Sequence, residues 1–368
     1  MRRLVIDARL AGHSGIGIYL EQMLPRVTRE LSHWRPLVLA RIESQHAIAT
    51  ALAPDVAVCE WDVPPLSARN MVAPPPAVTD QDLLWVPHFN VPLRSSVPLA
   101  VTLHDLLPLS APGLVGAGRA AALRWWLRAI RTRAQAVFCI SAFTRNDAVR
   151  FGACTMEQAT VTPLGVDPIW FNETTAEHDA DSGPPTIIFV GLLKPHKNVA
   201  GLLRAFLQVS KAIPHRLVLV AKHTGVRNID REAGGLIARL GDRVELVENL
   251  PQSELVARVR AAAFAVVPSL HEGFGLPALE AMAAGTPVLA SRAGALPEVC
   301  GDDALYCDPL SESGIAEGLL RLAGDAALRR QLSAAGRTRA AGFSWDRCAE
   351  QTATELDRAL RESSRAAS

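Results

Sequence analysis

The chain has 368 residues, of which 49% are hydrophobic and 20% are charged, and its formal net charge is +1 at pH 7. This length exceeds what one hydrophobic core usually supports, so two domains are expected. The hydrophobic content excludes a disordered chain, and the balanced charge gives no reason to expect nucleic acid as a partner.

Short apolar runs alternate with segments of helical period, which is typical of parallel sheets covered by helices on both faces. In the first half, strands are predicted at residues 2–8, 35–40, 56–61, 82–87, 99–105, 136–141 and 159–164. In the second half, they are predicted at residues 185–191, 216–221, 243–247, 263–269, 286–291 and 304–308. The pattern predicts an α/β protein with two doubly wound parallel sheets.

Between the two series, apolar periodicity stops and acidic, Thr, Gly and Pro residues take over, as in a linker. We therefore predict domains at residues 1–170 and 186–342, joined by a linker at 171–185. Residues 343–362 form a last amphipathic helix, followed by a fraying tail to residue 368.

Ligands of such domains are expected at the carboxyl ends of the strands, in the cleft between the domains. The run "PSLHEGFGLPALEAMAAGTPVLAS" follows a predicted strand and opens a helix, with Pro277 at its first position and Gly285 at its end. The loop before the helix consists of Glu272, Gly273, Phe274, Gly275 and Leu276. Its backbone N–H groups and the helix dipole favour an anion such as a diphosphate.

The two glutamates of this run are candidates for contacts with a bound ligand. Glu272 is expected to project into the cleft, and Glu280 to accept two hydrogen bonds from a cis-diol such as a ribose. The alternative is that both are solvated charges favoured by the helix dipole.

The loop after residues 185–191 contains Lys194 and Lys197, two of only four lysines among the 38 basic residues. A lysine there suits the neutralisation of a leaving phosphate, although a solvated loop would have the same sequence. In the first domain, Gly15 and Gly17 follow the first strand and resemble a short phosphate-binding loop, or merely a tight turn. His104 and Asp105 end the strand at 99–105, where an imidazole can contact a sugar or serve the fold.

These motifs resemble those of the family 4 retaining glycosyltransferases over nearly the whole chain. The strongest match is "HEGFGLPALEAMAAGTPV", with its glutamates eight positions apart, supported by "SGIGIYL", "VTLHDLLPL", "ISAFTRNDAV", "VTPLGVD", "FVGLLKPHKN" and "FSWDRCA". Within the family, the chain is most similar to bacterial mannosyltransferases and deoxyhexosyltransferases that build lipopolysaccharide O-chains.

The resemblance implies the GT-B fold, in which two Rossmann-like domains face each other across a cleft and the last helix packs back on the N-terminal domain. The N-terminal domain would bind the acceptor and the C-terminal domain the nucleotide sugar. By the same resemblance, Glu272 holds hydroxyls of the donor sugar, Glu280 the ribose and Lys197 the diphosphate. Gly15 and Gly17 would line the phosphates, and His104 would contact the donor sugar near the reaction centre.

One position departs from the family pattern. Many relatives have arginine directly after the glycine that ends the strand, whereas Leu192 follows Gly191 here, so Lys194 is the candidate substitute. The sequence has no DxD motif beside a strand end, and neither a metal ion nor another cofactor is expected.

The predicted function is retaining transfer of mannose or a deoxyhexose from a GDP-linked donor to a glycan or polyprenyl-linked glycan in O-antigen synthesis. Front-side displacement is the expected mechanism, with Glu272 as a covalent nucleophile the alternative. Rival functions are a sugar-nucleotide epimerase, a pyridoxal-type phosphorylase, and a non-catalytic nucleotide-sugar sensor or subunit.

A basic segment bears on the acceptor. Residues 116–150 contain seven arginines and one aspartate, a net charge of +6. Arg124, Arg128 and Arg131 share one predicted helical face, beside an apolar stripe of Leu123, Trp126, Leu127 and Ile130. The region Arg119–Arg133 can therefore bind an anionic membrane surface, or it is a solvated face whose stripe packs on the sheet.

No run reaches about 18 uninterrupted apolar residues, and the six cysteines include no C-x-x-C pair. We therefore expect a cytoplasmic protein, with peripheral attachment to the inner face of the membrane as the alternative.

Overall fold

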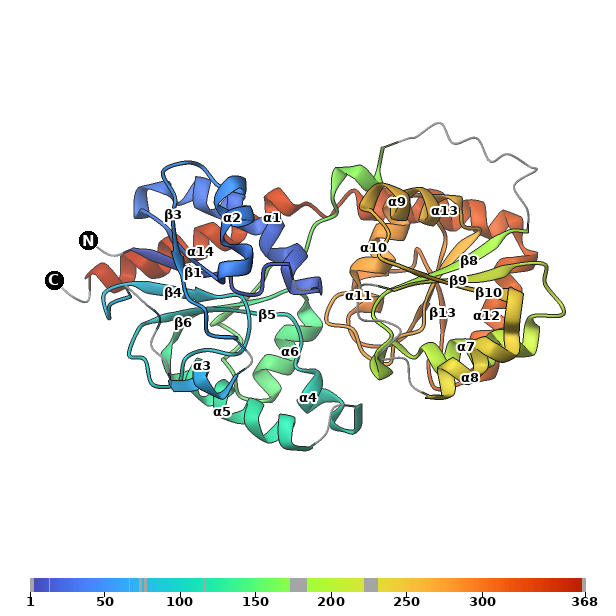
Figure 1. Ribbon diagram of the computed structural model, residues 1–368, viewed down its shortest axis with the longest axis horizontal. Coiled ribbons are helices and arrows are strands. Elements are labelled where there is room, and N and C mark those ends of the chain that lie inside the picture. Colours follow the sequence, from blue (N-terminus) through green and yellow to red (C-terminus); the bar gives the residue numbers. More distant parts are fainter. Residues whose placement is uncertain are drawn as a thin grey trace. The chain divides into compact units, whose positions relative to one another are not determined.

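The computed structural model describes residues 3–12, 14–65, 67–72, 75, 78–114, 117–172, 184–221 and 231–365. The chain divides into two compact units (Figure 1). Unit 1 combines Met1–Gly165 with Trp345–Ser368, and unit 2 consists of Val166–Ser344. Most of the linker predicted at 171–185, namely residues 173–183, lies outside the described residues.

Unit 1 contains a seven-stranded parallel sheet in the order β3-β2-β1-β4-β5-β6-β7. Its strands are β1 (Leu4–Asp7), β2 (Leu37–Ala40), β3 (Ala57–Glu60), β4 (Leu83–Val86), β5 (Leu99–Leu103), β6 (Ala134–Cys139) and β7 (Ala159–Val161). Each predicted strand of the first half is present. The chain runs outward from β1 to β3 and then returns to β4 on the other side of β1, so the sheet changes direction between β1 and β4.

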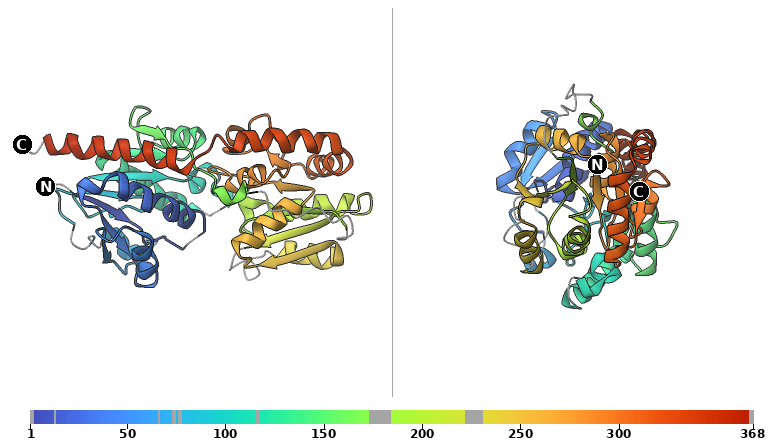
Figure 2. Two further views of the ribbon diagram at one scale, coloured as in Figure 1. Left: turned by 90° about the horizontal axis from the view of Figure 1, so that it is seen from above. Right: turned by 90° about the vertical axis from the view of Figure 1, so that its right-hand side faces the viewer.

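Helices cover both faces of this sheet. They are α1 (Ser14–Glu30), α2 (Ile42–Ala51), α3 (Ala68–Val72), α4 (Leu107–Ser110), α5 (Ala117–Arg133), α6 (Ala142–Arg150) and α14 (Trp345–Arg365). As predicted, the last helix packs on the N-terminal part of the chain, where α14 lies along α1 (Figure 2). The rings of Tyr19 and Trp345 meet edge to face with centroids 6.3 Å apart.

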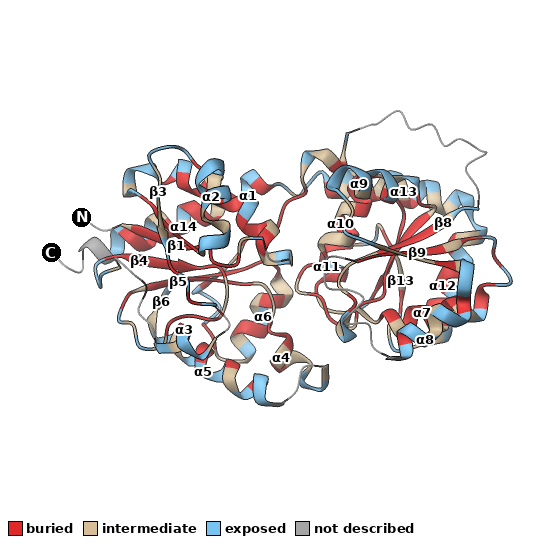
Figure 3. Cartoon of the chain, viewed as in Figure 1, coloured by how far each residue is buried: buried red, intermediate tan, exposed pale blue. Residues whose placement is uncertain are grey.

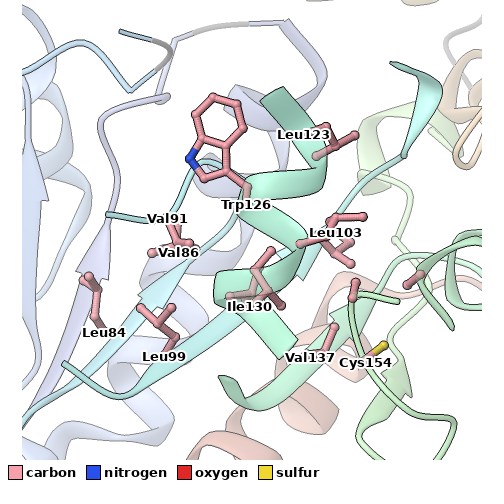
Figure 4. Packing of buried hydrophobic residues seen from close by; sticks show 14 of the residues in the cluster. Leu84, Val86, Val91, Leu99, Leu103, Leu123, Trp126, Ile130, Val137 and Cys154 are labelled. Carbon is pink, nitrogen blue, oxygen red and sulfur yellow. The ribbon is translucent and has the colours of Figure 1, made fainter. Parts of the chain in front are cut away.

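Helix α5 covers the opposite face through the apolar stripe noted in the sequence. Leu123, Trp126 and Ile130 belong to one buried cluster with strand residues such as Val86 and Leu103 (Figure 4). Burial of each such side chain stabilises the fold by about 1.5–3 kcal/mol. The stripe therefore belongs to the core of unit 1, and it is not available to a membrane.

Unit 2 contains a six-stranded parallel sheet in the order β10-β9-β8-β11-β12-β13, with each predicted strand present. Its strands are β8 (Thr186–Val190), β9 (Arg216–Ala221), β10 (Val244–Glu248), β11 (Phe264–Val267), β12 (Val288–Ser291) and β13 (Leu305–Cys307). Its helices are α7 (Val199–Val209), α8 (Arg231–Leu240), α9 (Gln252–Ala261), α10 (Leu276–Ala283), α11 (Leu296–Cys300), α12 (Glu312–Gly324) and α13 (Ala326–Ala340).

Helices α7, α8 and α12 cover one face of the unit 2 sheet, and α9, α10 and α13 cover the other (Figure 1). The central strands are buried on both faces (Figure 3). The direction of this sheet changes between β8 and β11. The loops that follow these two adjacent strands therefore emerge side by side at the carboxyl edge.

Candidate functional site

Hydrogen bonds hold the loops after β8 and β11 together. The loop after β8 forms one 3₁₀ turn, Pro195–Lys197, in which the carbonyl of His196 accepts the Leu270 N–H at 2.7 Å. Asn198 adopts a left-handed conformation, and its Nδ2 donates to the carbonyl oxygens of Pro268 at 3.1 Å and Pro309 at 2.7 Å. The position of Lys197 relative to the second loop is thus fixed on both sides.

An ion pair joins the two loops. Lys197 Nζ donates to Glu272 Oε1 at 2.6 Å, and Ser269 Oγ donates to the same oxygen at 2.7 Å. Burial would raise the pKa of Glu272, but the charge of Lys197 and the hydrogen bonds from Lys197 and Ser269 outweigh it and lower the pKa below its ordinary value. Glu272, with 8% of its surface exposed, is therefore a carboxylate at neutral pH.

Two more basic side chains lie in the loop after β8. Burial and the charge of Lys197 lower the pKa of His196 to about 4, so its imidazole is neutral at pH 7. Lys194 is exposed and forms no side-chain ion pair with the described residues. Gly191 directly follows β8, and its N–H donates to the Val220 carbonyl at 3.0 Å.

Helix α10 begins at Leu276, so Pro277 occupies its second position. The sequence predicts the first position, which is wrong by one residue. Gly275 precedes the helix with φ 103°, and a Cβ there would lie 2.6 Å from Leu296 Cδ2. Glycine is thus required both by conformation and by space. Glu280 lies in the second turn of α10 and is partly exposed.

Phe274 and Gly273 differ in their surroundings. Phe274 is buried, and its ring packs edge to face on Phe343 with centroids 5.8 Å apart. Its side chain therefore anchors the loop in the core of unit 2. At this position, only the backbone can contact a bound ligand. Gly273 is partly exposed beside Glu272.

In unit 1, His104 follows β5, and its Nε2 lies 3.1 Å from the carbonyl oxygen of Pro87. Since a carbonyl only accepts, Nε2 carries the proton and Nδ1 is an acceptor in the neutral ring. Burial lowers the pKa of His104 to about 4, although the hydrogen bond to Pro87 acts in the opposite direction. Asp105 accepts the Leu107 N–H at 3.0 Å and thus serves the start of α4.

A second histidine, which the sequence did not single out, follows β4 beside the change of direction. The Asn90 N–H lies 3.2 Å from His88 Nδ1. Burial, together with the nearby His104, lowers the pKa of His88 to about 3. The described carboxyl ends of β4 and β5 thus present two imidazoles that are neutral at physiological pH.

Gly15 and Gly17 lie in the first turn of α1 and not in the loop that the sequence suggested. Gly15 is exposed and borders open space, whereas a Cβ on Gly17 would lie 3.1 Å from Gly12 N. The first turn of a helix carries unpaired N–H groups, so Gly15 presents backbone donors at the carboxyl edge of the sheet.

Three residues that shape the unit 2 site carried no distinct signal in the sequence. Asn198 and Ser269 stand inside the quoted motifs. The partners of Asn198 lie in other segments, whereas Ser269 bonds to Glu272 within its own run, and the sequence does not show that contact. Gly294, with φ 60°, lies against the backbone of Glu272, where a Cβ would be 2.6 Å from Glu272 N. A glycine two residues before a helix is an ordinary turn signal, and it does not identify the loop it contacts.

Comparison with known proteins places the chain among enzymes that transfer sugars. Residues 171–339 match the model of glycosyl transferases group 1, and residues 79–169 match the model of glycosyltransferase family 4. The MMP alpha-(1->4)-mannosyltransferase of Mycolicibacterium hassiacum is 33% identical over 73% of this chain and 67% of its own. The O-antigen chain mannosyltransferase B of Escherichia coli is 28% identical over 72% of this chain and 71% of its own.

Solved structures show the same fold. Anabaena Alr3699/HepE, determined in complex with UDP and glucose, superposes with a TM-score of 0.76 at 18% identity, covering 97% of this chain and 100% of that one. The protein is therefore a glycosyltransferase of the GT-B fold. It belongs to glycosyltransferase family 4.

No helix in the described part of the chain is both long enough and apolar enough to span a membrane.

Proposed function

We propose that this glycosyltransferase transfers mannose or a related deoxyhexose from a GDP-linked donor to a hydroxyl of a glycan or polyprenyl-linked glycan, with retention of configuration. The similarity to two mannosyltransferases supports mannose as the sugar. The similarity to the O-antigen chain enzyme supports a role in cell-surface polysaccharide synthesis.

The Lys197–Glu272 pair carries the proposal. An ammonium has three N–H donors, and only one of those on Lys197 is engaged by a described residue, which leaves two for phosphate oxygens. During transfer, negative charge grows on the departing β-phosphate while the sugar becomes cationic. Lys197 stabilises the first charge, and the Glu272 carboxylate holds the hydroxyls of the sugar.

The other predicted residues complete the proposed site. Lys194 supplies a second cation, the loop Gly273–Leu276 and the first turn of α1 supply N–H groups to the diphosphate, and Glu280 binds the ribose. The imidazole of His104 is neutral, and its Nδ1 can accept a hydrogen bond from a hydroxyl of the sugar. The positive charge of the proposed site comes from lysines and helix N-termini, without a metal ion.

For the chemical step, we propose front-side displacement, in which the leaving phosphate accepts the proton of the acceptor hydroxyl. The bond from the anomeric carbon to the β-phosphate oxygen breaks as the bond to the acceptor oxygen forms on the same face. A slow donor analogue that traps a glycosyl adduct on Glu272 would overturn this route in favour of a covalent nucleophile.

The test combines donor binding with turnover. Among GDP-mannose, a GDP-deoxyhexose and UDP-glucose, GDP-mannose is expected to raise the melting temperature most, because a bound ligand stabilises by RT ln(1 + [L]/Kd). Glu272→Gln is expected to lower donor turnover by about 10²- to 10³-fold. Donor conversion without an acceptor would indicate an epimerase, and donor binding without turnover would indicate a non-catalytic subunit.

We further propose that the exposed face of α5 contacts an anionic membrane surface. Trp125 is 62% exposed, and the exposed side chains of Arg124, Arg128 and Arg131 lie on the same side of the helix. An exposed tryptophan among arginines suits the interface of an anionic bilayer. Arg133 is not part of this face, since its guanidinium donates to the carbonyls of Pro92 and Val97.

Sedimentation with vesicles that contain phosphatidylglycerol tests this contact, with neutral phosphatidylcholine vesicles as the control. A variant that combines Trp125→Ser with glutamate at the three arginines should stay in the supernatant. If the wild type and this variant sediment equally, the membrane proposal is wrong.

A further inference from the structure

Ser269 is a fully buried residue two positions beyond β11, and its hydroxyl donates to Glu272 Oε1 at 2.7 Å. A second serine forms a hydrogen bond to the backbone of Ser269. Ser291, the last residue of β12, is also fully buried and donates its hydroxyl to the Ser269 carbonyl oxygen at 2.5 Å. This second hydrogen bond engages the backbone carbonyl of Ser269 and not its hydroxyl, which is the group that meets the carboxylate.

Both hydrogen bonds to the Glu272 carboxylate converge on one oxygen. Lys197 and Ser269 donate to Oε1, and no described residue donates to Oε2. The last torsion of a glutamate is broad and has no strong preference of its own. Two donors aimed at the same oxygen therefore select one orientation of the carboxylate.

We propose that Ser269 is a positioning residue that orients the Glu272 carboxylate and leaves Oε2 for hydroxyl groups of the donor sugar. The inference rests on the proposed function, because it takes Glu272 as the contact to that sugar. A sugar hydroxyl donates to Oε2, while Oε1 remains bound by Lys197 and Ser269. Without Ser269, Lys197 alone holds the carboxylate, which can then turn both oxygens toward the ammonium.

The test separates sugar binding from nucleotide binding. Isothermal titration gives the affinities of the 368-residue protein for GDP and GDP-mannose, and for UDP and UDP-glucose. Ser269→Ala is expected to weaken binding of the nucleotide sugar by about tenfold, while affinity for the free nucleotide changes by less than about twofold. Loss of a merely structural hydroxyl would weaken both ligands alike.

Ser291→Ala is the matched control, because it removes a buried serine hydroxyl next to the site that does not touch the carboxylate. It should reduce the melting temperature and leave the ratio of the two affinities unchanged. If Ser269→Ala does not fold, the same ratio of affinities can be measured with Ser269→Cys. Its thiol fills a similar volume but donates only a weak hydrogen bond.

The outcomes distinguish this inference from the proposed function. If the wild type binds neither nucleotide sugar, the proposed function is wrong and the role of Ser269 with it. If Glu272→Gln loses the preference for the nucleotide sugar but the Ser269 variants keep it, only the positioning role is overturned.

Discussion

Each unit has an ion pair at the carboxyl end of its central strands, and the two pairs differ in how their cations are engaged. In unit 1, Arg9 Nη2 lies 2.6 Å from Asp7 Oδ2, and the guanidinium also donates to Val63 and Asn70 and stacks 3.3 Å above the ring of Trp61. In unit 2, Lys197 has Glu272 as its one side-chain partner among the described residues.

The difference separates a structural pair from the pair that we propose to be functional. The Arg9 side chain has no exposed surface, and its donors are used by the protein itself. The Lys197 side chain keeps 16% exposure and has donors to spare. A buried charge is tolerated in both pairs because each cation has an anionic partner. Only Lys197 keeps N–H donors that a ligand can use.

The largest effect is expected for Arg9→Met, which leaves the Asp7 carboxylate buried without its partner. Removal of one member of a buried pair costs about 3–5 kcal/mol, so the free energy of unfolding should fall by that amount in urea titrations. Any folded fraction should retain the wild-type affinity for the nucleotide sugar. A variant with normal stability would contradict the structural role of this pair.

Lys197→Met tests the other pair through activity. Loss of one group that stabilises the transition-state charge costs about 3–4 kcal/mol of barrier, so kcat/KM should fall by about 10²- to 10³-fold. Steady-state kinetics measure the loss, and Lys211→Met, at an exposed lysine beyond α7, serves as the control. Wild-type kinetics in Lys197→Met would remove the basis for the functional reading of the pair.

Gly294→Ala displaces the backbone of Glu272 without a change of charge. The new Cβ would lie 2.6 Å from Glu272 N, and φ 60° is itself unfavourable for alanine. Gly285→Ala is the matched control, because φ is 78° but the nearest atom to its Cβ is Ser333 Oγ at 3.5 Å. Both variants should lose about 1 kcal/mol of stability through backbone strain. Gly294→Ala should lose more than this, because its Cβ meets the Glu272 backbone, and it alone should also lose turnover.

The last prediction concerns the pH dependence of stability. Burial lowers the pKa of His88 to about 3 and of His104 to about 4, from the ordinary value of 6.5. Between pH 6.5 and 4, the unfolded chain binds more protons at these positions, so stability is full above pH 6.5 and decreases as the pH falls. His104→Asn should flatten this slope by at most about 1.4 kcal/mol per pH unit, measured by urea unfolding at several pH values.

Much of the fold follows from the sequence, because buried parallel strands are apolar runs that few other elements imitate. Residues 216–221, for example, were predicted as a strand and form β9 with the same bounds. The predicted location of Gly15 and Gly17 in a loop was wrong, because both lie within α1. The residue at which this helix begins depends on packing as well as on local signals.

The candidate site was only partly predictable. Glu272 and Lys197 were identified by type and by place after a strand, but their contact joins residues 75 positions apart. That contact requires knowledge that β8 and β11 are neighbours, which depends on the order of strands in the sheet. Phe274 stays a predicted binding residue, but the contact of its ring with Phe343 joins distant segments and could not be read from the sequence.

The contact between α1 and α14 has a consequence for biosynthesis. Helix α14 belongs to unit 1 but follows the whole of unit 2, about 180 residues, in the sequence. The ribosome therefore needs roughly 10 to 40 s to reach it after Met1–Gly165 has been made. During that time, the surface of α1 around Tyr19, which α14 covers in the native protein, remains exposed on the nascent chain. Unit 2, by contrast, is made in one continuous stretch. Unit 2 can thus reach its native state before the half that is translated first.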